Sequence, residues 1–207
     1  MNVQRLRAVA FDCDGVMFDS TQANLAYYNH ILAHVALPPM TREQFVYAHM
    51  HTADQTLAYL IADERILAAA DRYRRTLSYL PFIRHMVKEP HLDRLLEALR
   101  PTYKIAIATN RTDTMQRVLL EHGLEDVFDC VVTARDVVHP KPHPEQLLYL
   151  LRVFKIAPLE MLFIGDSELD AAAAREAGVP FVAYANQALP ADHHISDLSQ
   201  VMRLLGL

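Results

Sequence analysis

The sequence predicts an α/β protein with a parallel sheet flanked by helices and a small helical segment inserted after the first strand. Short apolar runs recur along the chain, and helix-patterned stretches separate most of them. One long segment near the start has helical patterning and no convincing strand. Short apolar runs alternating with helices are typical of parallel strands, because such strands are buried on both faces.

The predicted strands are separated by helices with ordinary start and stop signals. Residues 113–123 and 167–178 each end on a glycine, and residues 144–154 open with a proline. The strands themselves are predicted at residues 6–11, 103–108, 130–133, 161–165 and 181–185. This repeated strand, helix, strand order predicts a doubly wound sheet.

The segment 20–85 interrupts the alternation, because several helix-patterned stretches follow one another in it. Isolated prolines, Pro81 and Pro90, mark the place where the chain would return to the sheet. We therefore expect a catalytic core made of residues 1–19 and 86–207, with a helical domain at residues 20–85.

Composition limits the possible functions. The 207 residues are 52% hydrophobic, which suffices for one full core and a small accessory domain. The net charge of -5 comes from mixed acidic and basic residues without a basic stripe, so we expect no nucleic acid partner. The N-terminal apolar run is too short for a signal peptide or membrane span, and two cysteines make no disulfide framework. We expect a soluble, cytoplasmic protein with no membrane partner.

Acidic residues stand where two predicted strands end. Asp12 and Asp14 close the first strand, and residues two apart on an extended backbone point the same way. Asp166 follows the strand at 161–165, and Asp170 lies one helical turn further on. Ligands of open parallel sheets bind at the carboxyl edge, so these carboxylates should converge there and bind a hard cation such as magnesium. Taken alone, Asp12 and Asp14 are also compatible with a solvated acidic turn. Asp170 alone is also compatible with a charge that complements the dipole of its helix.

Two further segments would complete the site. Thr109 and Asn110 lie between a strand and a helix, where a hydroxyl and free backbone N–H groups can hold a phosphate oxygen, although helix capping is the simpler reading of either alone. Lys141 stands between Pro140 and Pro142, which hold its backbone extended. An ammonium group fixed in this way predicts charge neutralisation at a site that handles phosphate.

Together these segments closely resemble the four motifs of the haloacid dehalogenase superfamily, specifically its phosphoglycolate phosphatase-like and sugar-phosphate phosphatase-like members. The motifs read DCDGVMFDS, ATN, the Lys141 segment and GDSELDAAAAREAG, and they extend over residues 12–178. The resemblance implies a Rossmann-like core with a helical cap domain inserted after the first motif.

The resemblance also implies a function and a set of roles. It implies a magnesium-dependent phosphatase (cofactor Mg²⁺) that hydrolyses a small phosphorylated metabolite through an aspartyl phosphate on Asp12. Asp14 would be the general acid/base and would bind the metal through its main-chain carbonyl, while Thr109, Asn110 and Lys141 would hold the phosphoryl group. Asp170 would support the metal directly or through water. The implied metal residues are Asp12, Asp14, Asp166 and Asp170.

Some features separate related activities and others leave them open. Asp14 argues against dehalogenation, since haloacid dehalogenases proper lack this second aspartate. Asn24 stands where many relatives, including sugar phosphomutases, have histidine, which favours a phosphatase slightly. The motifs themselves do not separate a phosphatase from a phosphomutase. A non-catalytic relative that only binds a phosphorylated ligand is a further alternative, although the intact charged residues argue against it.

Three residues are candidates for substrate specificity: His49, His51 and Arg111. The two histidines lie between helical stretches of the inserted segment, and Arg111 follows the second motif. Solvated linker histidines and a solvated arginine are the simpler alternatives. None of the histidines has the spacing of a zinc site. The sequence leaves the substrate open and is compatible with a monomer or a homodimer.

Overall fold

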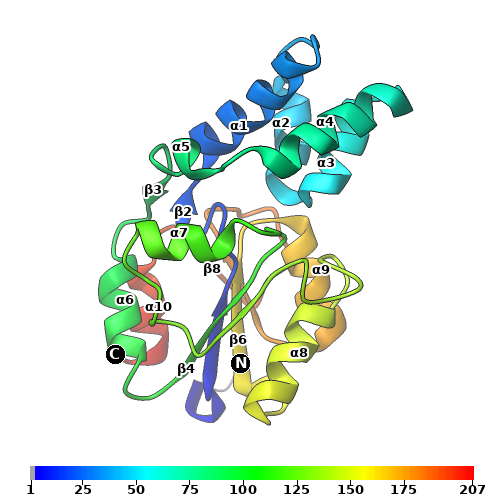
Figure 1. Ribbon diagram of the computed structural model, residues 1–207. Coiled ribbons are helices and arrows are strands. Elements are labelled where there is room, and N and C mark those ends of the chain that lie inside the picture. Colours follow the sequence, from blue (N-terminus) through cyan, green and yellow to red (C-terminus); the bar gives the residue numbers. More distant parts are fainter. Residues whose placement is uncertain (1–2) are drawn as a thin grey trace. The chain divides into compact units, whose positions relative to one another are not determined.

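The computed structural model describes residues 3–207, and the chain divides into two compact units (Figure 1). The first unit combines the chain up to residue 18 with residues 88–207, and the second contains residues 19–87. Two-residue strands, β2 (Phe18–Asp19) and β3 (Val87–Lys88), stand where the chain passes from one unit to the other and back.

The first unit is built on a six-stranded parallel sheet. Its strand order is β5-β4-β1-β6-β7-β8, and every pairing is parallel. In chain order these are strands 3-2-1-4-5-6, the order of a doubly wound Rossmann-like sheet. The strands are β1 (Ala8–Phe11), β4 (Lys104–Ala108), β5 (Cys130–Val132), β6 (Met161–Gly165), β7 (Phe181–Tyr184) and β8 (His193–Ile195). The predicted fold class is confirmed.

Helices cover both faces of this sheet (Figure 1). On one face α8 (Glu145–Phe154) and α9 (Glu168–Ala177) pack against the strands and each other, and on the other face α6 (Leu92–Leu99) packs with α10 (Ser199–Leu205). Small side chains of β1 and β4 share a core with α8 and α9, which lets these helices approach the sheet closely. Three further short helices are α7 (Met115–Glu121) and the 3-10 turns Val3–Arg5 and Pro158–Glu160.

The second unit contains helices only, apart from the ends of β2 and β3. Two helix starts have a threonine capping box, at Thr41 and Thr52, and a third is capped by Asp63. Aromatic packing holds its first and last helices together, because the ring of Tyr27 lies 4.9 Å from that of Tyr79 and 5.4 Å from that of Phe82. Its helices are α1 (Thr21–His34), α2 (Arg42–Met50), α3 (Ala53–Leu60), α4 (Glu64–Thr76) and α5 (Leu80–Ile83).

The predicted strands are observed with ends that differ by at most two residues. The elements that the sequence did not predict include one strand of the six-stranded sheet, β8, and two of its covering helices, α6 and α10. The strand β8 reads His-His-Ile, which has no apolar run, and its strand conformation comes from pairing with β7. Within residues 3–207 no helix combines the length and the apolar character needed to span a membrane.

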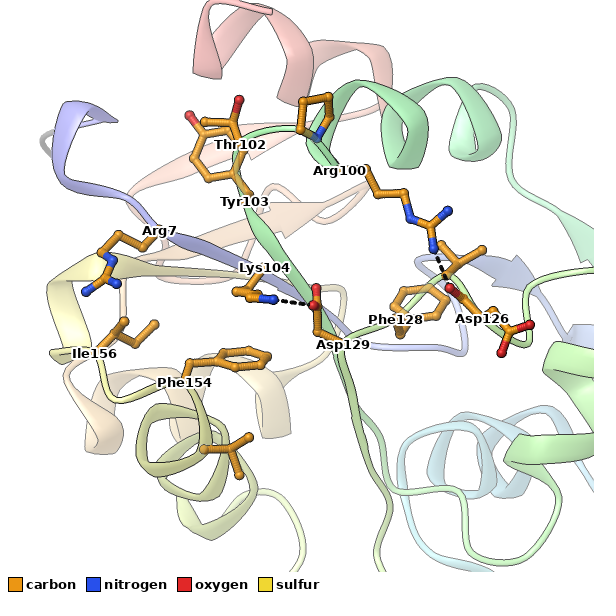
Figure 2. A pocket seen from close by; sticks show the side chains of 13 residues that line it. Arg7, Arg100, Thr102, Tyr103, Lys104, Asp126, Phe128, Asp129, Phe154 and Ile156 are labelled. Carbon is orange, nitrogen blue, oxygen red and sulfur yellow. Dashed lines mark hydrogen bonds and ion pairs between the residues drawn. The ribbon is translucent and has the colours of Figure 1, made fainter.

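The amino edge of the sheet carries a hollow of about 1060 Å³ (Figure 2). Two of its charged groups are paired with each other, because the Nζ of Lys104 lies 2.6 Å from one carboxylate oxygen of Asp129. The other oxygen of Asp129 accepts a 2.9 Å hydrogen bond from the N–H of Ile105, and Arg100 donates to the main-chain carbonyl of Asp126. These contacts fasten the start of β4 to the segment before β5, at the edge opposite to the end of β1.

Candidate active site

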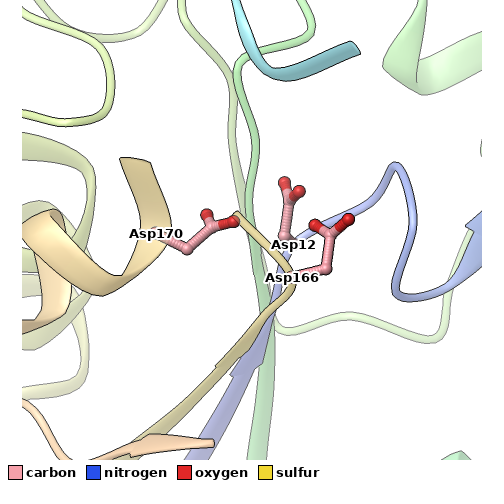
Figure 3. A group of neighbouring side chains, drawn as sticks. All are labelled: Asp12, Asp166 and Asp170. Atoms are coloured by element: carbon pink, nitrogen blue, oxygen red, sulfur yellow. The ribbon is translucent and has the colours of Figure 1, made fainter. Parts of the chain in front are cut away.

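An acidic cluster lies at the carboxyl edge of the sheet, where β1 and β6 end side by side (Figure 3). Asp12 directly follows β1, Asp166 directly follows β6, and Asp170 lies in the first turn of α9. One carboxylate oxygen from each residue lies within 4.8 Å of those of the other two. The strand order reverses between β1 and β6, so the cluster occupies the position where doubly wound sheets bind ligands.

Glycine makes this close approach possible. Gly15 has a φ of +80°, and a Cβ at this position would lie 2.2 Å from Oδ2 of Asp166. A Cβ on Gly165 would lie 2.4 Å from the Cβ of Asp170. Any side chain at either position would displace a carboxylate of the cluster, so both glycines are needed for its geometry.

Lys141 supplies a buried positive charge to the cluster. Its Nζ lies 2.7 Å from Oδ1 of Asp12 and 2.6 Å from Oδ1 of Asp170, and it also donates to the carbonyl of Ala108 at 2.9 Å. Burial alone would lower the pKa of Lys141, but the attraction of the two carboxylates outweighs it and raises the pKa. The ammonium group therefore stays charged.

The carboxylates are held at a high electrostatic cost. Burial raises the pKa of Asp12 to about 7, with Lys141 opposing the shift and Asp170 adding to it. Burial, followed by the charges of Asp170 and Asp12, raises the pKa of Asp166 well above its usual value. The single positive charge of Lys141 does not neutralise three carboxylates, so the cluster attracts additional positive charge.

Asp170 is fixed by the start of its own helix. Ser167 is the N-cap of α9, and its N–H and hydroxyl both donate to Oδ2 of Asp170, at 3.1 and 2.5 Å. The Ser-x-x-Asp spacing of a capping box was a signal in the sequence that could have identified Ser167. Because Lys141 binds the other oxygen, Asp170 has well-defined partners on both sides.

Two of the residues expected to hold a phosphoryl group, Thr109 and Asn110, follow β4 directly. The side-chain amide of Asn110 makes two 3.0 Å hydrogen bonds with the main chain of Lys141, donating to its carbonyl and accepting from its N–H. The hydroxyl of Thr109 accepts from the N–H of Arg111 at 3.1 Å. Gln146, a buried residue that sequence reasoning missed, donates to the carbonyl of Thr109 at 2.8 Å. Asn110 thus orients Lys141, and Gln146 holds the loop after β4.

Asp14 has a different partner from the other aspartates. Its Oδ2 accepts from Nε of Arg111 at 2.7 Å, and its Oδ1 accepts from Nη2 of the same residue at 2.6 Å. A third nitrogen of Arg111, Nη1, donates to the hydroxyl of Thr114 at 3.1 Å. The side chain of Asp14 lies outside the three-carboxylate cluster, which is compatible with a metal contact through its main-chain carbonyl.

The site residues fit a divalent cation. The donor atoms of the cluster are all carboxylate oxygens, which magnesium prefers. If Asp12, Asp14, Asp166 and Asp170 are ionised, the basic residues that pair with their four charges within residues 3–207 are Lys141 and Arg111, which leaves two negative charges in a largely buried site. One divalent ion would balance them.

The remaining candidates lie in the second unit. The ring of His51 stacks on Tyr47 at 3.7 Å, with its Nδ1 2.9 Å from the Tyr47 carbonyl, and that of His49 lies 5.5 Å from Phe45. Asn24 is buried and accepts a 2.8 Å hydrogen bond from the hydroxyl of Tyr79. The contacts of His49 with Phe45 and of His51 with Tyr47 thus lie within α2 and its C-cap.

Fold and site together define an α/β enzyme with an aspartate and lysine centre at the switch point of a doubly wound sheet. The chain belongs to the haloacid dehalogenase-like hydrolase family, whose model matches residues 9–184.

Individual relatives match over nearly their whole length. A phosphoglycolate phosphatase from Chromobacterium violaceum is 30% identical and covers 99% of both chains. The pyrophosphatase PpaX of Bacillus velezensis is 28% identical and covers 100% of both. A crystal structure of a haloacid dehalogenase superfamily hydrolase, subfamily IA, from Geobacter sulfurreducens is 38% identical, covers 98% of this chain and 97% of that one, and has a TM-score of 0.80.

Proposed function

We propose that this hydrolase is a magnesium-dependent phosphatase that cleaves a small phosphate monoester through an aspartyl phosphate on Asp12. The main support for this proposal is the arrangement around the buried carboxylate of Asp12. Lys141 binds one of its two oxygens, and the carboxylates of Asp166 and Asp170 lie close by. The names of the relatives, phosphoglycolate phosphatase and pyrophosphatase, support a reaction at a phosphoryl group.

In the proposed first step, one carboxylate oxygen of Asp12 attacks phosphorus while the bond from phosphorus to the ester oxygen breaks. Lys141 binds Oδ1 of Asp12, so Oδ2 is the attacking atom in this proposal. The ammonium group reduces the repulsion between the carboxylate and the anionic ester, and it stabilises the charge that develops on the phosphoryl oxygens. Asn110 supports this step by fixing the main chain of Lys141.

Asp14 would transfer protons in both steps. It would give a proton to the departing ester oxygen, and it would then take one from the water that attacks the aspartyl phosphate. Both tasks require its carboxylate to lie within hydrogen-bond reach of the ester oxygen, about 2.6–3.2 Å.

Asp12, Asp166 and the main-chain carbonyl of Asp14 would hold magnesium. Asp170 would contribute mainly by fixing Lys141, since both of its oxygens already have protein partners. When bound, magnesium would offset the charge of substrate and nucleophile as a Lewis acid.

We propose further that the second unit, residues 19–87, is a cap that contacts the variable part of the substrate. The partner would be a small phosphorylated metabolite. A cytoplasmic location and a monomer or homodimer remain predictions. The free cysteines Cys13 and Cys130 are compatible with a reducing compartment.

The test compares Asp12→Asn with a matched Asp126→Asn variant at the exposed amino edge of the sheet. With magnesium, Asp12→Asn should lower hydrolysis of para-nitrophenyl phosphate by more than about a thousandfold, because a nucleophile is lost, whereas Asp126→Asn should keep the activity. Mass spectrometry of the rapidly quenched wild type should place the phosphoryl group on Asp12. A phosphoryl group on any other residue would refute the assignment. Full activity after chelation would refute the magnesium requirement.

A phosphomutase would give a different result with sugar phosphates. It would return the phosphoryl group to the sugar, so an isomeric sugar phosphate would accumulate without stoichiometric inorganic phosphate. Stoichiometric phosphate release supports the phosphatase.

A further inference from the structure

Arg111 and Asp14 form a bidentate ion pair between residues 97 positions apart in the sequence. Both N···O distances are short, 2.7 and 2.6 Å, and the two side chains are only 7% and 11% exposed. A hydrogen bond to Thr114 holds a third nitrogen of the guanidinium group. Arg111 is thus the second buried cation of the site, separate from Lys141.

A purely structural role does not explain this pair well. Buried ion pairs are often no more stabilising than apolar side chains of similar size, so stability alone is weak grounds for placing one here. Arg111 also occupies both oxygens of the carboxylate that has to handle the ester proton. The two N–H groups of Arg111 thus compete with the ester oxygen for the carboxylate of Asp14, and exchange of one of them would free an oxygen of Asp14 for the ester.

Geometry limits what can replace Asp14 on Arg111. In the proposed reaction Asp14 comes within about 2.6–3.2 Å of the ester oxygen, so a group bonded to Asp14 lies beside the first atoms of the leaving group. The guanidinium fork already binds a carboxylate in the bidentate geometry that suits it best. Lys141 cannot take this part, because it is committed to Asp12 and Asp170.

We infer that Arg111 binds a carboxylate on the leaving group of the substrate and thereby releases Asp14 to the ester oxygen. This inference rests on the proposed function and assigns one specificity-determining residue within it. The substrates that benefit carry the carboxylate one or two carbons from the ester oxygen. With a neutral leaving group, Arg111 would stay bound to Asp14, and such a substrate would be hydrolysed more slowly.

The experiment varies the residue and the substrate together. kcat/KM is measured with magnesium for phosphoglycolate and for its neutral amide, glycolamide phosphate, in the wild type and in Arg111→Gln, Arg111→Lys and Arg135→Gln. Arg135 is the matched control because it pairs with Asp113 at 3.2 Å and is 57% exposed. The folding of each variant is checked by circular dichroism.

We expect the wild type to prefer the carboxylate substrate. Arg111→Gln should lower kcat/KM for phosphoglycolate, because the substrate carboxylate loses its partner, and the preference for phosphoglycolate over the amide should fall roughly ten- to a hundredfold. Arg111→Lys should show more preference for phosphoglycolate than Arg111→Gln and less than the wild type, because lysine keeps the positive charge but lacks the planar guanidinium group. Arg135→Gln should keep the wild-type ratio.

Equal losses for the two substrates in Arg111→Gln, or a wild type without preference, would overturn the inference. Failure of the proposed function gives a different result, because the wild type would then hydrolyse neither substrate nor para-nitrophenyl phosphate. In that case calorimetry with the unreactive analogues 3-phosphonopropionate and 3-phosphonopropanamide decides the role of Arg111. A carboxylate preference that Arg111→Gln abolishes supports it, and equal binding of both analogues refutes it.

Discussion

Replacing Lys141 by methionine should strongly destabilise the protein, apart from any effect on catalysis. Methionine has a similar length and no charge, and the contacts of Asn110 to the main chain of residue 141 can persist. The substitution removes the ammonium group that lies 2.7 Å from Asp12 and 2.6 Å from Asp170. The acidic cluster then has no close basic partner among the described residues.

The expected magnitude follows from burial. Lys141 is 3% exposed and Asp170 is fully buried, and removing one partner of a buried ion pair costs about 3–5 kcal/mol. In a chain of this length each kcal/mol lowers Tm by about 2–4 °C, so the expected decrease is roughly 6–20 °C. The matched control is Lys104→Met, because the side chain of Lys104 is 61% exposed and a surface pair contributes only about 0.2–1 kcal/mol.

The assay is thermal unfolding followed by circular dichroism at neutral pH, with chelator and then with magnesium. Lys141→Met should unfold well below the wild type in chelator, and Lys104→Met close to it. Added magnesium should raise the Tm of Lys141→Met more than that of the wild type, because the variant has one cation fewer in the site. If Lys141→Met loses no more than Lys104→Met does, the electrostatic reasoning is refuted.

Two further predictions concern the amino edge of the sheet and the second unit. Burial would raise the pKa of Asp129, but the hydrogen bonds from Lys104 and the Ile105 N–H outweigh it and lower the pKa, so Asp129 stabilises the fold above its unfolded pKa of about 3.9. Asp129→Asn should therefore unfold more easily than the wild type at neutral pH, and the difference in urea midpoint should shrink as pH falls through the folded-state pKa; a difference independent of pH contradicts this. In the second unit, His49→Ala and His51→Ala should change kcat/KM for the best metabolite relative to para-nitrophenyl phosphate by roughly ten- to a hundredfold, since in the proposed function the second unit contacts only the variable part of the substrate. Parallel losses for both substrates, or none, reject a role in specificity.

The sequence was informative wherever local pattern determines structure. Apolar runs and helix punctuation predicted five strands of the sheet, and parallel strands bring their carboxyl ends to one edge. Asp12 and Asp166 could therefore be expected at a common edge although they are 154 positions apart in the sequence. The structure places them there, beside Asp170 and Lys141.

Local pattern was uninformative where pairing with a neighbour decides the conformation. The strand β8 has no apolar run, and it is a strand because β7 offers it an edge. The helices α6 and α10 also went unpredicted, and they pack against each other on one face of the sheet.

By itself, the sequence determined the chain order of five strands and of the helices α7, α8 and α9 between them, and which charged residues follow the strand ends, because both depend on neighbouring residues. Only the tertiary structure decided which of those charges pair. Arg111 binds Asp14, Asn110 binds the main chain of Lys141, and Lys141 bridges Asp12 and Asp170. These contacts join segments from different strands, so they depend on strand order and register and on glycines small enough to let the carboxylates meet.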